Sequence, residues 1–103
     1  MVAIGQIPDK LFGFDAAGVV RRVGADVTDY QIGDNVAMYG HGSHRTVHRS
    51  KASYCAPIPK GLTFEQAATV PVVHGTAWYG LIQLARIEKG QSILIHAAAG
   101  GVG

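Results

Sequence analysis

The sequence predicts an α/β fold in which a strand-rich first part is followed by helices and then by one buried strand. Short apolar runs separated by glycines occupy the chain up to residue 61, and the hydrophobic period changes from about 2 to about 3.6 after it. A final apolar run, Ile93–Ile95, leads into a glycine-rich segment. This order indicates a small β-barrel joined to the start of a βαβ unit. We place the domain boundary near residue 61, which gives domains of residues 1–61 and 62–103.

The strand-rich part begins with two extended segments. Met1–Ile7 is short and apolar, and Pro8 follows it, so this segment is expected to be the end of a strand closed by a turn. Gly13–Gly24 is expected to be extended as well. Within it, Gly18 predicts a β-bulge, because an isolated glycine inside a strand often marks one.

Two further strands are expected before residue 51. Gly33 and Asp34 predict a tight turn, because both residue types are favoured in turns. This turn leads into the expected strand Asn35–Tyr39. The alternation of residues across Ser43–Ser50 predicts another strand. The first part of the chain is therefore expected to be all-β.

Two helices are expected after residue 61. Thr63 and Gln66 are three residues apart and can form a capping box, which predicts a helix that ends near Val70-Pro71. A second helix is expected from about His74 to the turn at Lys89-Gly90. Its apolar face follows the spacing i, i+3, i+4 and i+7, and consists of Trp78, Leu81, Ile82 and Ala85.

The last segment carries the pattern Ala98-x-Gly100-x-x-Gly103 directly after the apolar run Ile93–Ile95. A buried parallel strand followed by a turn of small residues is typical of dinucleotide-binding sites, where the backbone approaches a pyrophosphate. The phosphate then lies at the N-terminus of the next helix. The sequence stops before such a helix, so we expect no nucleotide binding by this segment alone. A glycine-rich bend without any ligand is the alternative reading of the motif.

Composition excludes several classes of protein. The chain is 48% hydrophobic and 16% charged, which is typical of globular proteins. Its net charge of +2 comes from scattered residues, so no nucleic-acid partner is expected. No apolar run approaches the roughly 20 residues of a membrane helix, and a cytoplasmic location is expected. Cys55 is the single cysteine and is expected to be a small buried filler that forms no internal disulfide.

Five motifs occur in the order found in the medium-chain dehydrogenase/reductase superfamily, and the chain most resembles the enoylreductase domain of fungal highly reducing polyketide synthases. The resemblance covers nearly the whole chain, and Val70-Pro71-Val72-Val73 is especially similar to the polyketide group. The motifs are Gly13–Val20, Gly33-Asp34-x-Val36, Ala67–Pro71, Thr76-Ala77 and His96–Gly103.

The resemblance implies the C-terminal part of a GroES-like β-barrel, followed by connecting helices and the first strand of a truncated Rossmann domain. Complete relatives are longer at both ends, so the chain is expected to be a fragment. Phe14 stands where zinc-dependent members have histidine, and a phenyl ring cannot bind a metal, which favours the zinc-independent branch. The spacing of His41, His44, His48 and Cys55 suggests a metal site as an alternative. On a strand, His44 and His48 would lie about 13 Å apart, too far to share one ion.

The implied activity is NADPH-dependent reduction of an enoyl thioester on an acyl carrier protein, within a polyketide synthase chain. By resemblance, Thr76 lies near the nicotinamide, although its hydroxyl could instead bond to the preceding helical turn. The expected pyrophosphate-binding residues are Ala98, Gly100, Gly101, Val102 and Gly103.

No residue is convincing as the catalytic acid. Tyr39, Tyr79 and His74 could donate a proton, but each is better explained as a core or rim residue, so the catalytic residues stay unknown. Asp15 is expected to be a turn or hydrogen-bonding carboxylate.

Two other functions remain open. One is a quinone oxidoreductase, which shares the zinc-free barrel and a similar glycine turn. The other is a non-catalytic remnant or interaction module that keeps the barrel strands but binds no nucleotide.

Overall fold

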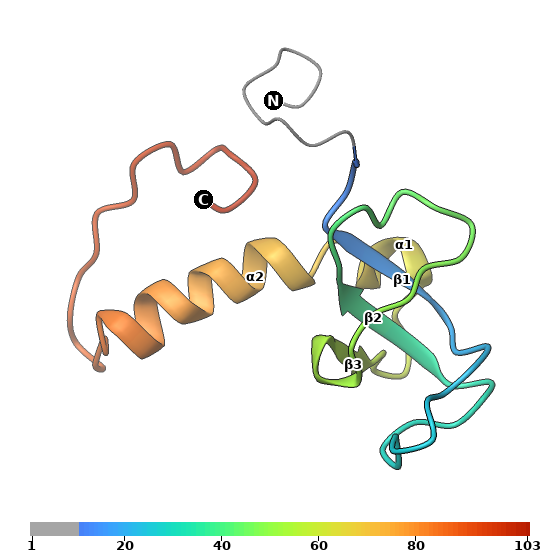
Figure 1. Cartoon of the computed structure of the whole chain (residues 1–103). Coiled ribbons are helices and arrows are strands. Elements are labelled where there is room, and N and C mark those ends of the chain that lie inside the picture. The colour runs from blue at the N-terminus through green and yellow to red at the C-terminus, as the bar shows by residue number, and fades with distance from the viewer. Residues whose placement is uncertain (1–10) are drawn as a thin grey trace.

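The computed structural model describes residues 11–103, so the strand expected at Met1–Ile7 lies outside the described residues. Figure 1 shows a small sheet with one short helix beside it, and a longer helix that extends away from both. The elements in chain order are β1 (Asp15–Val19), β2 (Asn35–Tyr39), η1 (Ala52–Tyr54), β3 (Cys55–Pro57), α1 (Phe64–Ala67), α2 (Pro71–Trp78) and η2 (Tyr79–Leu84).

The sheet is antiparallel, with strand order β1-β2-β3. Strand β2 has the predicted bounds, and the predicted turn before it is confirmed. Gly33 has φ +99°, a conformation that glycine adopts without steric cost. The Asp34 carboxylate accepts a 2.7 Å hydrogen bond from the Gln31 amide and closes the turn. Strand β3 was not predicted, because its three residues are too few to show a period.

Two predictions for the strand-rich part were wrong. Gly18 is no bulge, because it pairs directly with Val36 in an uninterrupted β1–β2 register. Ser43–Ser50 is not a strand. Gly42, at φ +76°, turns the chain back, and the Ser43 amide bonds to the carbonyl of Gly13 instead of to a neighbouring strand. The segment is therefore a loop that folds over the start of β1.

Helix α1 begins as predicted with a complete capping box. The Gln66 amide donates to the Thr63 hydroxyl at 3.2 Å, and the Thr63 amide donates to the Gln66 side-chain oxygen at 3.0 Å. Helix α2 begins at Pro71, three residues earlier than predicted from the apolar spacing. Proline suits the first helical position, where its missing N–H would have no partner and its φ is already helical.

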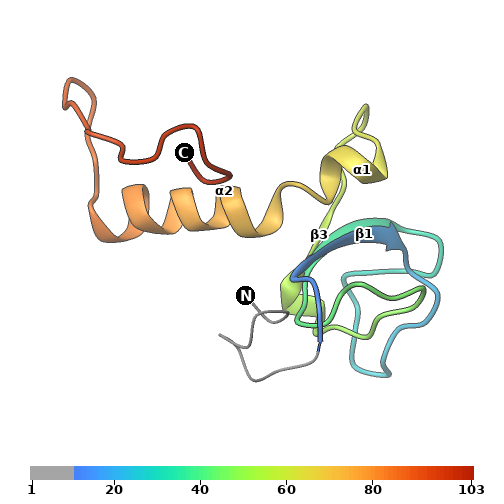
Figure 2. The same ribbon diagram turned by 90° about the horizontal axis from the view of Figure 1, so that it is seen from above.

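Helix α2 continues into η2, which has π-helical spacing, and the chain turns at Arg86, where φ is +50°. The apolar face predicted for this helix is not covered within residues 11–103, since Trp78 is 55% exposed and Ile82 is 46% exposed. The reason is visible in Figures 1 and 2, where α2 and η2 project away from the sheet. The turn predicted at Lys89-Gly90 is confirmed, with Gly90 at φ +95°.

The strand predicted at Ile93–Ile95 is not formed. Leu94 is 84% exposed, and the segment hydrogen-bonds to no neighbouring strand in the described part of the chain. A strand buried on both faces depends on neighbours for its backbone hydrogen bonds, so its pattern alone does not create it.

Among residues 11–103, the buried hydrophobic residues are Val36 in β2 and Ala67 in α1, at 7% and 2% exposure. The core of the described chain therefore lies in the sheet and against α1. No helix in this part has the length and apolar character to cross a bilayer.

Candidate functional site

The glycine-rich turn doubles back on itself. A Cβ atom added to Gly103 would lie 2.5 Å from the Ala98 Cα and 2.7 Å from the Ala97 carbonyl oxygen, so a side chain at this position would open the turn. The residue with positive φ is Ala97, at +53°, and not one of the motif glycines. The turn therefore needs glycine at its third position for close backbone approach rather than for an unusual φ.

The turn presents free hydrogen-bond donors. The Gly100 amide donates to the Ala97 carbonyl at 2.9 Å. The amides of Gly101, Val102 and Gly103 donate to no acceptor among the residues that the structure describes, and all three residues are exposed. Successive unpaired N–H groups in a turn form a site that attracts anions.

The turn lies beside α2. A Cβ atom on Gly101 would come within 3.9 Å of the Val73 side chain, and both views show the C-terminal coil running back along this helix. Thr76 follows Val73 by three residues, so both are on the same side of α2. The structure thus places the predicted pyrophosphate residues next to the helix that carries the predicted nicotinamide residue.

Thr76 is exposed on α2, and its hydroxyl donates a 2.7 Å hydrogen bond to the Val72 carbonyl one turn earlier. This is the bond to the preceding helical turn that was the alternative for Thr76. It uses the hydroxyl proton but leaves the oxygen able to accept a bond from another donor.

Asp15 links the sheet to α2. Its carboxylate accepts a 2.8 Å hydrogen bond from the Val72 amide, across 57 residues of sequence. Its backbone carbonyl accepts a second bond, 2.8 Å long, from the hydroxyl of Ser43, which is 5% exposed. The prediction of a hydrogen-bonding carboxylate is confirmed, but the sequence held no indication of this distant partner.

A row of aromatic rings crosses one end of the sheet, and the sequence had not suggested it. Phe14 stacks on His41 at 5.0 Å and on Tyr39 at 6.3 Å between ring centroids. Tyr39 meets the edge of Tyr54 at 5.8 Å, and the Lys51 ammonium lies 5.6 Å from the Tyr54 ring centre. The β1–β2 pairing explains the arrangement, since Tyr39 lies opposite the residue after Phe14.

The metal-ligand candidates from the sequence are His41, His44, His48 and Cys55. No group of three His, Cys, Asp or Glu side chains within residues 11–103 is arranged to hold an ion. Cys55 is half-buried, and burial raises the pKa of its thiol. Its carbonyl accepts a 2.6 Å bond from the Tyr30 hydroxyl, whose pKa is also raised, first by burial and then by the nearby Cys55 and Asp29.

The proton-donor candidates from the sequence are on the surface. Tyr39 is 44% exposed in the aromatic row, Tyr79 is 57% exposed at the start of η2, and His74 is exposed on α2. None of them lines the open pocket formed by Asn35, Ile58 and residues 62–65.

Comparison with known proteins agrees with the fold and with the order of motifs. The alcohol dehydrogenase GroES-like domain matches residues 2–79. The chain is 70% identical over its whole length to a highly reducing polyketide synthase of Cryptosporiopsis sp., of which it covers 4%. It is 52% identical over its whole length to a partially reducing polyketide synthase of Talaromyces stipitatus, again covering 4% of that protein. The chain therefore spans a small fraction of these relatives.

Solved structures give the same result. The CurK enoyl reductase superposes with a TM-score of 0.85 at 42% identity, over 90% of this chain and 28% of that one. An alcohol dehydrogenase superfamily protein from Novosphingobium aromaticivorans superposes with a TM-score of 0.84 at 38% identity, over 88% of this chain and 29% of that one. The resemblance to medium-chain reductases, and to reducing polyketide synthases among them, is confirmed. The chain belongs to the alcohol dehydrogenase GroES-like domain family.

Proposed function

We propose that the chain is part of a zinc-independent, NADPH-dependent enoylreductase that reduces an enoyl thioester carried by an acyl carrier protein during polyketide synthesis. The observation that carries this proposal is the turn of small residues, with three unpaired backbone donors, packed beside the helix that bears Thr76. The high identity to reducing polyketide synthases and the likeness to an enoyl reductase structure support it.

The residues present fit a dinucleotide. The free amides of Gly101, Val102 and Gly103 would hold the pyrophosphate, and the small methyl group of Ala98 and the missing side chain of Gly100 leave room for it. The Thr76 oxygen would accept a hydrogen bond from the nicotinamide side of the cofactor. When bound, the reduced cofactor supplies a hydride to the β-carbon of the enoyl group, whose α-carbon then takes a proton.

Two further parts of the proposal rest on particular residues. Zinc independence rests on Phe14, whose ring has no lone pair for a metal and is instead stacked on His41. The proposed domains are residues 1–61, which contain the sheet, and 62–103, which contain α1, α2 and the glycine turn.

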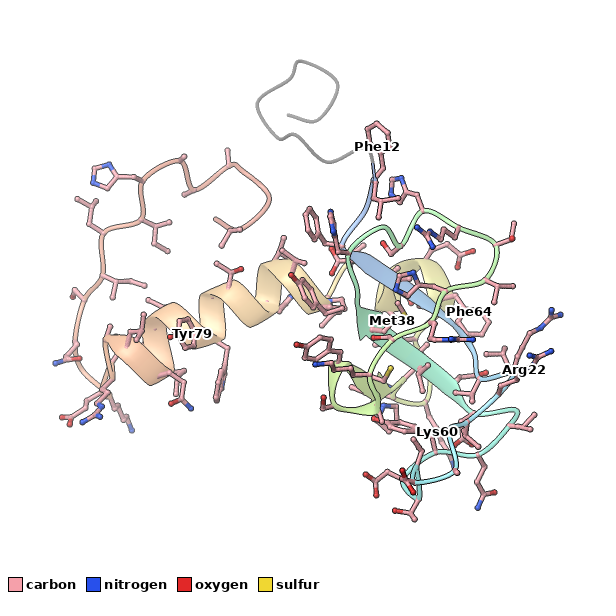
Figure 3. All side chains as sticks on the ribbon, viewed as in Figure 1. Phe12, Arg22, Met38, Lys60, Phe64 and Tyr79 are labelled. Atoms are coloured by element: carbon pink, nitrogen blue, oxygen red, sulfur yellow. The ribbon has the colours of Figure 1, made fainter. Side chains whose placement is uncertain are left out.

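The test compares Gly100→Val with Lys60→Ala in the complete polyketide synthase that contains this chain. A Cβ atom at Gly100 would already lie 3.2 Å from the Ala97 carbonyl oxygen, so a branched side chain crowds both the turn and the phosphate position. Lys60 lies at the sheet, far from the C-terminal turn, as Figure 3 shows. We expect Gly100→Val to abolish NADPH binding and reduction of an enoyl thioester, and Lys60→Ala to change neither.

Cofactor affinity is measured by the fluorescence of NADPH, and turnover by its absorbance with an enoyl thioester. Unchanged binding and turnover in Gly100→Val would contradict the nucleotide assignment. Reduction of quinones without reduction of enoyl thioesters by the unmodified protein would contradict the substrate assignment. Absence of NADPH binding by the unmodified protein would favour a non-catalytic module.

A further inference from the structure

We propose that Asp15 is a positioning residue that fixes the first turn of α2, and with it Thr76, relative to the sheet. This inference rests on the proposed function, because it gives Asp15 a part in placing a residue on the cofactor side. It assigns a role in the reaction to a side chain that the sequence indicated only as a hydrogen-bonding carboxylate.

Helix α2 has no side-chain cap from its own capping residue. The first N–H groups of any helix lack partners inside the helix, and a side chain just before the helix usually supplies one. Here the residue in the capping position is Val70, which has no polar side chain, and the first turn of α2 carries no acidic residue. The Val72 amide finds its acceptor instead in the carboxylate of Asp15, at 2.8 Å.

Asp15 is held in a fixed position by the sheet. It is the first residue of β1 and pairs with Tyr39 of β2, so its backbone is held in the sheet. Its carbonyl also accepts the 2.8 Å bond from the buried hydroxyl of Ser43. A carboxylate on such a rigid element is a fixed anchor, and its negative charge is favourable at the positive end of the helix dipole.

Val72 connects Asp15 to Thr76. Val72 donates its backbone N–H to the Asp15 carboxylate, and its carbonyl, in the next peptide unit, accepts a 2.7 Å bond from the Thr76 hydroxyl. Three hydrogen bonds, joined through the covalent atoms of Asp15 and Val72, therefore link Ser43 to Thr76. The same chain orients the Thr76 hydroxyl so that its oxygen can only accept a bond from a bound ligand.

The experiment uses the complete polyketide synthase and three variants. Asp15→Ala removes the acceptor, whereas Asp15→Asn keeps an oxygen that can still accept the Val72 amide. Asp34→Ala is the matched control, because Asp34 also accepts a backbone amide bond, from Gln31 at 2.7 Å, but within a local turn. Hydrogen exchange measured by mass spectrometry on peptides covering residues 70–78 reports on α2, and NADPH titration and steady-state kinetics report on function.

We expect Asp15→Ala to speed exchange at the start of α2 by about tenfold or more, because the Val72 amide loses its hydrogen bond to a charged acceptor. The same variant should raise the KM for NADPH severalfold. Asp15→Asn should restore most of both properties, and Asp34→Ala should leave both unchanged.

Three outcomes separate the possibilities. Unchanged exchange in Asp15→Ala would show that Asp15 does not hold α2. Faster exchange with an unchanged KM for NADPH would reduce Asp15 to a structural cap and overturn the positioning role. If the unmodified protein binds no NADPH while exchange still depends on Asp15, the proposed function fails and the hydrogen-bond assignment stands.

Discussion

Gly13→Ala should destabilise the chain considerably more than Gly33→Ala, although both glycines have a positive φ. The φ values are +87° at Gly13 and +99° at Gly33. A Cβ atom at Gly13 would lie 2.5 Å from both the Ser43 hydroxyl oxygen and the His44 ring, whereas at Gly33 it would meet nothing within 4 Å. The pair therefore separates backbone strain from steric exclusion.

The difference can be worked out from these contacts. Backbone strain at a positive φ costs roughly 1–2 kcal/mol and applies to both variants. Gly13→Ala also displaces Ser43 and breaks its hydrogen bond to the Asp15 carbonyl, which contributes about 1 kcal/mol. The buried Ser43 hydroxyl then lacks its partner, which costs about 1 kcal/mol more. An extra destabilisation of about 2 kcal/mol lowers the Tm by roughly 8–16 °C for a domain of this size.

Thermal denaturation of the two purified variants, followed by circular dichroism, measures this difference. Ser43→Ala is then combined with each glycine variant. Because Gly13→Ala already breaks the hydrogen bond of the Ser43 hydroxyl, the effects of Gly13→Ala and Ser43→Ala on the Tm should be less than additive. Equal Tm values for Gly13→Ala and Gly33→Ala would refute the contact between Gly13 and the Ser43 loop.

Three other predictions concern stability. Thr63→Ala should lower the free energy of unfolding by about 1 kcal/mol in urea denaturation, because it removes the capping box of α1, whereas Thr63→Ser should not. Burial raises the pKa of the Cys55 thiol above its ordinary value of 9.0, so the folded chain holds this proton to a higher pH than the unfolded chain does. The free energy of unfolding should therefore fall as the pH rises past 9.0. Urea titrations from neutral to alkaline pH should show a smaller fall for Cys55→Ala. Deleting residues 92–103 should leave the Tm unchanged, since Leu94 is 84% exposed and the segment joins no sheet; a large loss would mean that it packs in a core.

The sequence by itself determined the local features of the fold and the family. The turn at Gly33, the strand Asn35–Tyr39 and the capping box at Thr63 were predicted correctly, because each depends on residues only a few positions apart. The order of motifs also identified the superfamily that the comparisons confirm. The cofactor roles of Thr76 and of the glycine turn, and the boundary near residue 61, stay predictions.

The tertiary structure decided what depends on distant neighbours. Ser43–Ser50 and Ile93–Ile95 both have strand-like patterns, but neither pairs with a strand in the described chain, and a strand without a partner leaves its backbone groups unsatisfied. The bond from Val72 to Asp15 and the aromatic row around Phe14 join residues that are far apart in sequence. Such contacts follow from the path of the whole chain, because local periodicity sets which face a residue takes but not which distant segment meets that face.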